Sequence, residues 1–198
     1  AIQELILMEE NDKSHTYLAR FAKLLRMLLE NANSPFIPLA RELEFLELYL
    51  SLENLRIPDL KYSIRKDPEI NTEQVMIPNM ILQPYIENAI WHGLSHKKIG
   101  ERELQLRVHK QTDGVVYEIE DNGVGRKKAA ELKSLYRKEH RSKGMELLTK
   151  RFRLLNEEYR FDIRTSISDV IHDNHVVGTL VTIQAPHELS AEYKQSAA

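Results

Sequence analysis

The stretch Leu82-Gln83-Pro84-Tyr85-Ile86-Glu87-Asn88-Ala89-Ile90-Trp91-His92-Gly93 is predicted to form one helix. Apolar residues recur along it at three- and four-residue steps, which is typical of a helix with one buried face. Asn88 lies between apolar positions, and a buried amide without a partner costs about 1–3 kcal/mol. Its amide is therefore expected to meet a polar group at the edge of a core. A hydrogen bond to neighbouring backbone and a role in binding both remain open from this stretch alone.

Two later stretches complete a pattern with this helix. An alternating strand from Tyr117 ends in Asp121-Asn122-Gly123-Val124-Gly125, and a second strand opens as Gly178-Thr179. The pattern has three parts in order: an asparagine on a helix, D-x-G-x-G after a strand, and G-T at the start of a later strand. This order is far more specific than any one part. The pattern resembles the ATP-binding domain of sensor histidine kinases, whose fold is shared with DNA gyrase, Hsp90 and MutL. The amino-acid sequence of residues 82–93 resembles that of the LytS-type sensor kinases, and the resemblance covers nearly the whole chain.

Composition narrows the classes of protein that remain. The chain has 198 residues, a net charge of −2 and no cysteine, which excludes disulfides and thiolate metal sites. A near-neutral chain argues against nucleic-acid binding, which usually needs a basic excess. No apolar run approaches the roughly 20 residues that span a bilayer, and no signal peptide is visible. The sequence begins without methionine inside a helical pattern, so we expect a piece of a longer protein.

The expected fold class is α+β. Alternating segments and helices follow one another from residue 60, which predicts a two-layer α/β sandwich with a mixed, largely antiparallel sheet. Within it, Asp113-Gly114 predicts a hairpin turn. The resemblance implies the histidine kinase/Hsp90-like fold. The expected organisation is a helical hairpin at residues 1–57, a catalytic ATP-binding domain at 58–187 and a frayed tail at 188–198.

The N-terminal hairpin allows two interpretations. The helix over residues 39–55 is apolar on more than one side, so it packs against more than one neighbour. An ordinary helical core explains this pattern. A hairpin that joins two subunits, as in histidine kinases, explains it as well and predicts a homodimer.

The D-x-G-x-G turn supplies a candidate site for adenine. An ionised Asp121 only accepts hydrogen bonds, and the adenine amino group donates them. Gly123 and Gly125 let the backbone approach a ligand closely. Taken alone, an aspartate before a glycine is more often a turn residue. The resemblance assigns Asp121 to adenine, and assigns Thr179 a hydroxyl role on the adenine side.

The helix supplies candidates for the metal and the phosphates. Mg²⁺ prefers oxygen ligands and keeps much of its water, so one amide, phosphates and waters could complete its shell. The resemblance gives Asn88 the metal and His92, one turn later, a phosphate contact, while a surface histidine is the alternative for His92. Further phosphate contacts are expected from Arg141, Lys143 and Gly144. There the usual G-x-G of the family is replaced by Ser142-Lys143-Gly144.

Transfer to a protein is favoured over hydrolysis. Hydrolases of this fold carry a glutamate four residues before the metal-binding asparagine, where it activates water. That position is Pro84 here. Glu87 points about 100° away from Asn88 around the helix, so it is a poor substitute for that water-activating glutamate. Our hypothesis is that Glu87 instead orients the attacking group in a kinase.

The resemblance implies the catalytic fragment of a two-component sensor histidine kinase, a phosphotransferase with ATP and Mg²⁺ as cofactors. It would pass the γ-phosphoryl group to a histidine and then to a response regulator receiver domain. The acceptor histidine is expected ahead of residue 1, and the fragment on the cytoplasmic side of a membrane-anchored bacterial sensor. The alternative is a non-catalytic nucleotide-sensing or scaffolding module with a weakened ATP site.

Overall fold

A five-stranded sheet forms one layer of the protein. The computed structural model describes residues 11–32, 34–57, 59–135, 150, 152–154, 156–157 and 162–186. The strand order is β2-β4-β5-β7-β6, and only the β2–β4 pair is parallel. The strands are β2 (Leu60–Lys66), β4 (Arg102–Gln111), β5 (Gly114–Asp121), β6 (Arg164–His172) and β7 (His175–Pro186).

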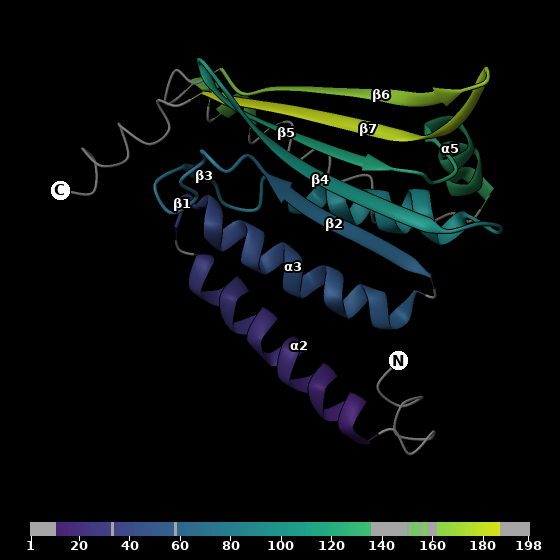
Figure 1. Cartoon of the computed structure of the whole chain (residues 1–198), viewed down its shortest axis with the longest axis horizontal. Coiled ribbons are helices and arrows are strands. Elements are labelled where there is room, and N and C mark those ends of the chain that lie inside the picture. Colours follow the sequence, from purple (N-terminus) through teal and green to yellow (C-terminus); the bar gives the residue numbers. More distant parts are fainter. Residues whose placement is uncertain are drawn as a thin grey trace.

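Helices cover one face of this sheet and form the second layer (Figure 1). A small antiparallel pair, β1 (Phe36–Pro38) with β3 (Met76–Pro78), lies beside them. The predicted α+β class, with two layers and a mixed, largely antiparallel sheet, is confirmed. The helical elements are α2 (Asn11–Asn31), α3 (Leu39–Arg56), α4 (Gln83–Asn88), the π-helix η1 (Ala89–Gly93), the 3₁₀-helix η2 (Leu94–His96) and α5 (Arg126–Leu135).

Alternation along the strands fixes which face is buried. Leu104, Leu106 and Val108 of β4 are each 1% exposed and point toward the helices. Because side chains alternate along a strand, the residues between them face outward. Tyr117 and Ile119 of β5 continue the buried row. The sheet therefore presents an apolar face to the helices and a polar face to water.

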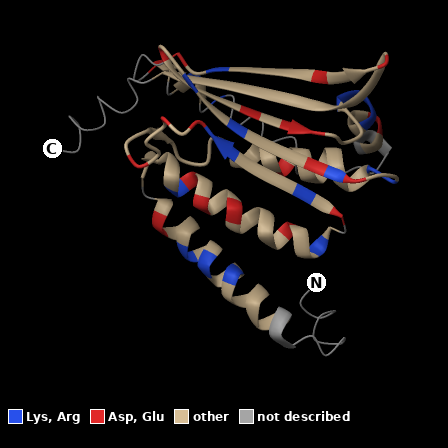
Figure 2. Cartoon of the chain, in the orientation of Figure 1, with Lys and Arg blue, Asp and Glu red and all other residues tan. Residues whose placement is uncertain are grey.

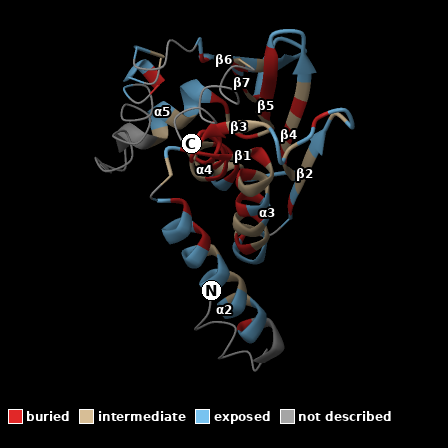
Figure 3. Ribbon diagram, turned by 90° about the vertical axis from the view of Figure 1, so that its left-hand side faces the viewer, coloured by how far each residue is buried: buried red, intermediate tan, exposed pale blue. Residues whose placement is uncertain are grey.

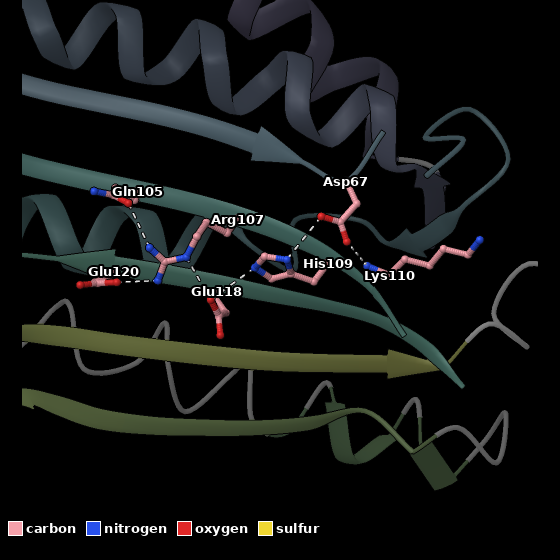
Figure 4. Close-up of polar contacts among 7 residues, drawn as sticks. All are labelled: Asp67, Gln105, Arg107, His109, Lys110, Glu118 and Glu120. Carbon is pink, nitrogen blue, oxygen red and sulfur yellow. Dashed lines mark hydrogen bonds and ion pairs between the residues drawn. The ribbon is translucent and has the colours of Figure 1, made fainter. Parts of the chain in front are cut away.

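The polar face carries paired charges, drawn in Figure 4. Arg107 on β4 contacts Glu118 at 3.0 Å and Glu120 at 2.5 Å, both on the neighbouring strand β5. His109 lies 3.5 Å from both Asp67 and Glu118. Arg107 is thus paired with two carboxylates of the neighbouring strand.

Residues on both sides of the expected domain boundary at residue 57 belong to one hydrophobic core. Leu39, Leu46 and Leu50 of α3 are at most 1% exposed and belong to the same core as the sheet. By contrast, α2 packs on α3 and extends away from the body, largely exposed in Figure 3. Among the described residues of α2, Met27 joins the same core and Leu24 packs against it, while most of the helix is exposed. The expected tail at 188–198 lies outside the described residues.

Candidate functional site

The motif residues surround one cavity of about 370 Å³. It lies between the α4–η1 helix, the start of α5, and the inner face of β5, β6 and β7. Five residues that the sequence singles out line it: Asn88, His92, Asp121, Gly125 and Thr179. Other lining residues are Tyr85, Ala89, Gly93, Ile119, Arg126, Ala129, Ala130, Ile167 and Val181. Arg141, Lys143 and Gly144 lie outside the described residues.

Asp121 closes the inner end of the cavity. It is the last residue of β5, is 5% exposed, and stands opposite Thr179 in the β5–β7 register. The backbone N–H of Gly123 donates to Asp121 Oδ1 at 2.8 Å. Burial raises the pKa of Asp121 to about 6, and the bond from Gly123 opposes this only in part. At neutral pH the carboxylate is ionised and can accept from a donor in the cavity.

Two glycines let the D-x-G-x-G turn meet the end of the helix. A Cβ placed on Gly123 would lie 2.4 Å from the carbonyl carbon of Gly93, closer than any real contact. Val124 N–H also donates to Gly93 O at 3.3 Å. Gly125 has φ +76°, a backbone conformation that favours glycine. The backbones of the turn and of the helix end thus approach closely, which positions Asp121 beside the helix.

The helix itself is held by a buried carboxylate from α3. Glu42 is 1% exposed and accepts from Met80 N–H at 3.0 Å and from Leu82 N–H at 3.2 Å. These donors precede or begin α4, where backbone N–H groups have no partner within the helix. Glu42 therefore holds the start of α4, the helix that forms one wall of the cavity.

The predicted helix over 82–93 is continuous but changes winding. After α4 the chain becomes the π-helix η1, whose turns are wider than those of an α-helix. Asn88 and His92 both face the cavity across this change. The structure thus brings the predicted metal and phosphate residues together on one wall.

Glu87 faces the other way, and its predicted catalytic role does not fit this placement. It accepts from Gln83 Nε2 at 2.8 Å and is absent from the cavity lining. Burial raises the pKa of Tyr49 on α3, and the charges of Glu53 and then Glu87 raise it further. Nearby, Arg56 of α3 lies 3.7 Å from the centroid of the Trp91 ring. This side of the helix is thus an interface with α3.

Several residues that line the cavity were not predicted as site residues from the sequence. Tyr85 bonds Thr165 of β6 through its side chain, and burial raises its pKa. Gly93 contacts the Asp121 carboxylate so closely that a Cβ there would lie 2.7 Å from Oδ1. Arg126 directly follows the D-x-G-x-G turn, so its position in the sequence was a usable signal.

A larger, open depression of about 800 Å³ lies at the β4–β5 turn, lined by Asp67, Pro68, Glu69, Lys110, Gln111, Thr112 and Asp113. Lys110 there pairs with Glu69 at 3.1 Å. None of the predicted ATP-site residues lines it. The smaller cavity is therefore the candidate site, because it gathers the motif residues against buried apolar walls.

The donor set fits a nucleotide with its metal better than a protein-held metal. Among the described residues, no cluster of three or more histidines, aspartates or glutamates could hold an ion. Asn88 offers one amide oxygen, and phosphate oxygens with waters would complete octahedral Mg²⁺. Among the described helices, none combines the length and the hydropathy that crossing a bilayer requires.

Comparisons with known proteins agree with the motifs. A sequence model of the family described as histidine kinase matches residues 1–61. The sensor protein LytS of Staphylococcus saprophyticus is 31% identical over 116 residues, which cover 59% of this chain and 19% of that protein. LytS of Bacillus subtilis is 34% identical over 114 residues, covering 58% and 19%. The chain thus spans about a fifth of the length of these curated relatives.

Among solved structures, the histidine kinase AdeS of Acinetobacter baumannii aligns with a TM-score of 0.47 at 16% identity, covering 92% of this chain and 84% of that one. The sequence matches to the family and to its curated members confirm the resemblance that the motifs indicate: this chain is similar to the LytS-type sensor histidine kinases.

Proposed function

We propose that this chain is the ATP-binding catalytic part of a two-component sensor histidine kinase. It binds Mg²⁺ with ATP and transfers the γ-phosphoryl group to a histidine, for relay to a response regulator. The observation that carries the proposal is the convergence of Asp121, Thr179, Asn88 and His92 on one cavity of about 370 Å³. Three separate sequence motifs supply these residues, and the fold joins them.

Each residue has a task that its placement supports. Asp121, at the inner end, accepts from the adenine amino group, and Thr179 opposite it adds a hydroxyl. Asn88 gives its amide oxygen to the metal, and His92 contacts phosphate. Bound Mg-ATP supplies an electrophilic phosphoryl group. Catalysis then rests on positioning and on neutralising charge.

The cavity favours transfer to a protein over hydrolysis. Asp121 is the only carboxylate among the described lining residues, and its Oδ1 accepts from Gly123. Pro84 stands where a water-activating glutamate would be, and Glu87 faces α3. A histidine acceptor needs no such base, because its imidazole is itself nucleophilic.

The exposed face of α2 supports a homodimer. Leu18, Phe21, Leu25 and Leu28 follow one another at steps of three, four and three residues, and each is 36–46% exposed. This is the spacing with which two helices form a coiled-coil seam. A second copy covering this stripe would bury it. A Leu25→Glu variant should remain folded and sediment as a monomer where the parent sediments as a dimer.

Calorimetric titration of Mg-ATP tests the nucleotide site. The parent should bind saturably. Asp121→Asn should lose binding because the asparagine NH2 group and the adenine amino group are both hydrogen-bond donors. Asp113→Asn, in the exposed β4–β5 turn, removes the same charge away from the cavity and should bind as the parent does. Absence of binding by the parent up to millimolar ATP would contradict the proposal and favour the scaffolding alternative.

Transfer is tested separately, because the acceptor histidine is expected outside this sequence. The fragment alone, incubated with γ-labelled ATP, should form no phosphohistidine. The longer protein with the upstream stretch should form it and pass it to a response regulator. Labile phosphohistidine on the fragment would place the acceptor within residues 1–198 and contradict this assignment.

A further inference from the structure

One charged side chain in the cavity has no role in the proposal above. Arg126 is the first residue of α5 and lines the cavity. Of the described lining residues, it alone carries a permanent positive charge. Its Nη1 donates to the backbone oxygen of Ile167 on the edge strand β6 at 3.1 Å. The side chain therefore extends from α5 toward the sheet.

The sheet register shows where along the cavity Arg126 lies. Asp121 stands opposite Thr179, while the next inward-facing pair of lining residues is Val181 with Ile167. Two residues along a strand span about 7 Å. Because Arg126 is bonded to Ile167, its guanidinium lies about that far along the strand direction from the Asp121–Thr179 pair, on the side of the edge strand β6.

The position of Asn88 can be bracketed in the same way. Tyr85, one turn before it, bonds Thr165, and Gly93, after it, contacts Asp121. Asn88 therefore lies between these two levels, near the level of Ile167. The helix wall and the α5 wall thus bring an amide and a guanidinium to the same part of the cavity.

We propose that Arg126 binds a phosphate group of the nucleotide from the α5 side, facing Asn88. This inference rests on the proposed function, since it names a residue of the same site. A guanidinium matches phosphate geometry with two parallel N–H donors, and an anionic triphosphate needs positive charge beside its metal. Helix stability does not explain arginine here, because a cation at a helix N-terminus meets the positive end of the dipole.

The chain offers matched controls next to Arg126. Lys127 and Lys128 follow it in the first turn of α5, where Figure 2 shows positive charge, and neither lines the cavity. Arg126→Met and Lys127→Met each remove one charge and keep an unbranched side chain. Arg126→Lys keeps the charge and loses the planar fork.

The experiment compares Mg-ATP with adenosine by calorimetry, using adenosine in competition with ATP where its own heat is small. Arg126→Met should bind ATP about 10-fold more weakly and adenosine as tightly as the parent. Lys127→Met should bind both as the parent does. Arg126→Lys should recover part of the affinity for ATP.

Three results would overturn the inference in distinguishable ways. Equal losses of ATP and adenosine affinity in Arg126→Met would mean that the residue only fastens α5 to β6. Equal losses of ATP affinity in the Arg126 and Lys127 variants would mean a general effect of charge. A parent that binds neither ligand would remove the proposed function and this inference together, whereas the first two results leave the proposed function standing.

Discussion

Replacing Asp121 with asparagine should stabilise the protein while removing adenine recognition. Burial raises the pKa of Asp121 to about 6 from an ordinary value of 3.8. The ionised carboxylate is therefore less favourable in the folded protein than in the unfolded chain. Asparagine has nearly the same shape, carries no charge, and keeps an oxygen that can accept from Gly123.

The sign and size of the effect follow from linkage. Between about pH 4 and 6 the folded protein holds a proton that the unfolded chain has lost, so stability falls as the pH rises. At about 1.4 kcal/mol per pH unit, the full cost above pH 7 is about 3 kcal/mol. It vanishes below about pH 4. The variant should therefore be more stable than the parent by about 3 kcal/mol at pH 8 and by about 1.5 kcal/mol at pH 5.

Urea unfolding of both proteins at pH 5, 6, 7 and 8 measures this difference. Other carboxylates titrate alike in both proteins, so their contributions cancel. Asp113→Asn is the control, and should change stability by less than about 0.5 kcal/mol at every pH. A variant less stable than the parent at pH 8, or a difference that stays constant with pH, would refute the reasoning that burial controls Asp121.

Three other perturbations test neighbouring features. Adenosine affinity should be constant above pH 7 and weaken about 10-fold per pH unit well below 6, because the proton turns the free carboxyl oxygen of Asp121 into a donor that faces the adenine amino group. Calorimetry at pH 5 to 8 measures this affinity. Gly178→Ala would place a Cβ 1.9 Å from the Asp121 carbonyl oxygen, and Gly114→Ala would place one 2.2 Å from the Ala185 carbonyl oxygen. Each variant should be about 3 kcal/mol less stable than the parent in urea unfolding, and only Gly178→Ala should also weaken nucleotide binding. Glu42→Ala should lose about 3 kcal/mol of stability because the buried N–H of Leu82 and the part-buried N–H of Met80 lose their acceptor, with Glu42→Gln losing less. Equal stabilities of the variants and the parent would contradict the capping role.

The sequence predicts the elements that local chemistry specifies. The β4–β5 hairpin follows from its alternation and from Asp113-Gly114, and both strands form around that turn. The strand β1 was missed because three residues give no alternation to recognise. It exists because Phe36 pairs with Pro78, far away in the chain. Such pairing is a tertiary effect that no local pattern contains.

In the candidate site, too, local motifs predict some residues, and others depend on tertiary packing. Asn88, Asp121 and Thr179 were found because their motifs are local, and the structure gathers them. Glu87 was assigned from its neighbour in sequence, although its direction depends on Gln83 and on the packing of α3. Arg126 belongs to none of the predicted motifs; its place directly after the D-x-G-x-G turn hints at the site, and the fold brings it to the cavity.

The single parallel pair in the sheet has a consequence for folding. Because β2 and β4 run parallel, the chain must cross from one end of the sheet to the other between them, and this crossover holds β3, α4 and η1. The wall that carries Asn88 is therefore connected through the chain to both strands of this pair. Detaching it would strain that pairing, so the wall and the strands should open as one cooperative unit. Amide hydrogens of α4 and β4 should then exchange with similar protection, and the site should persist until the sheet itself unfolds.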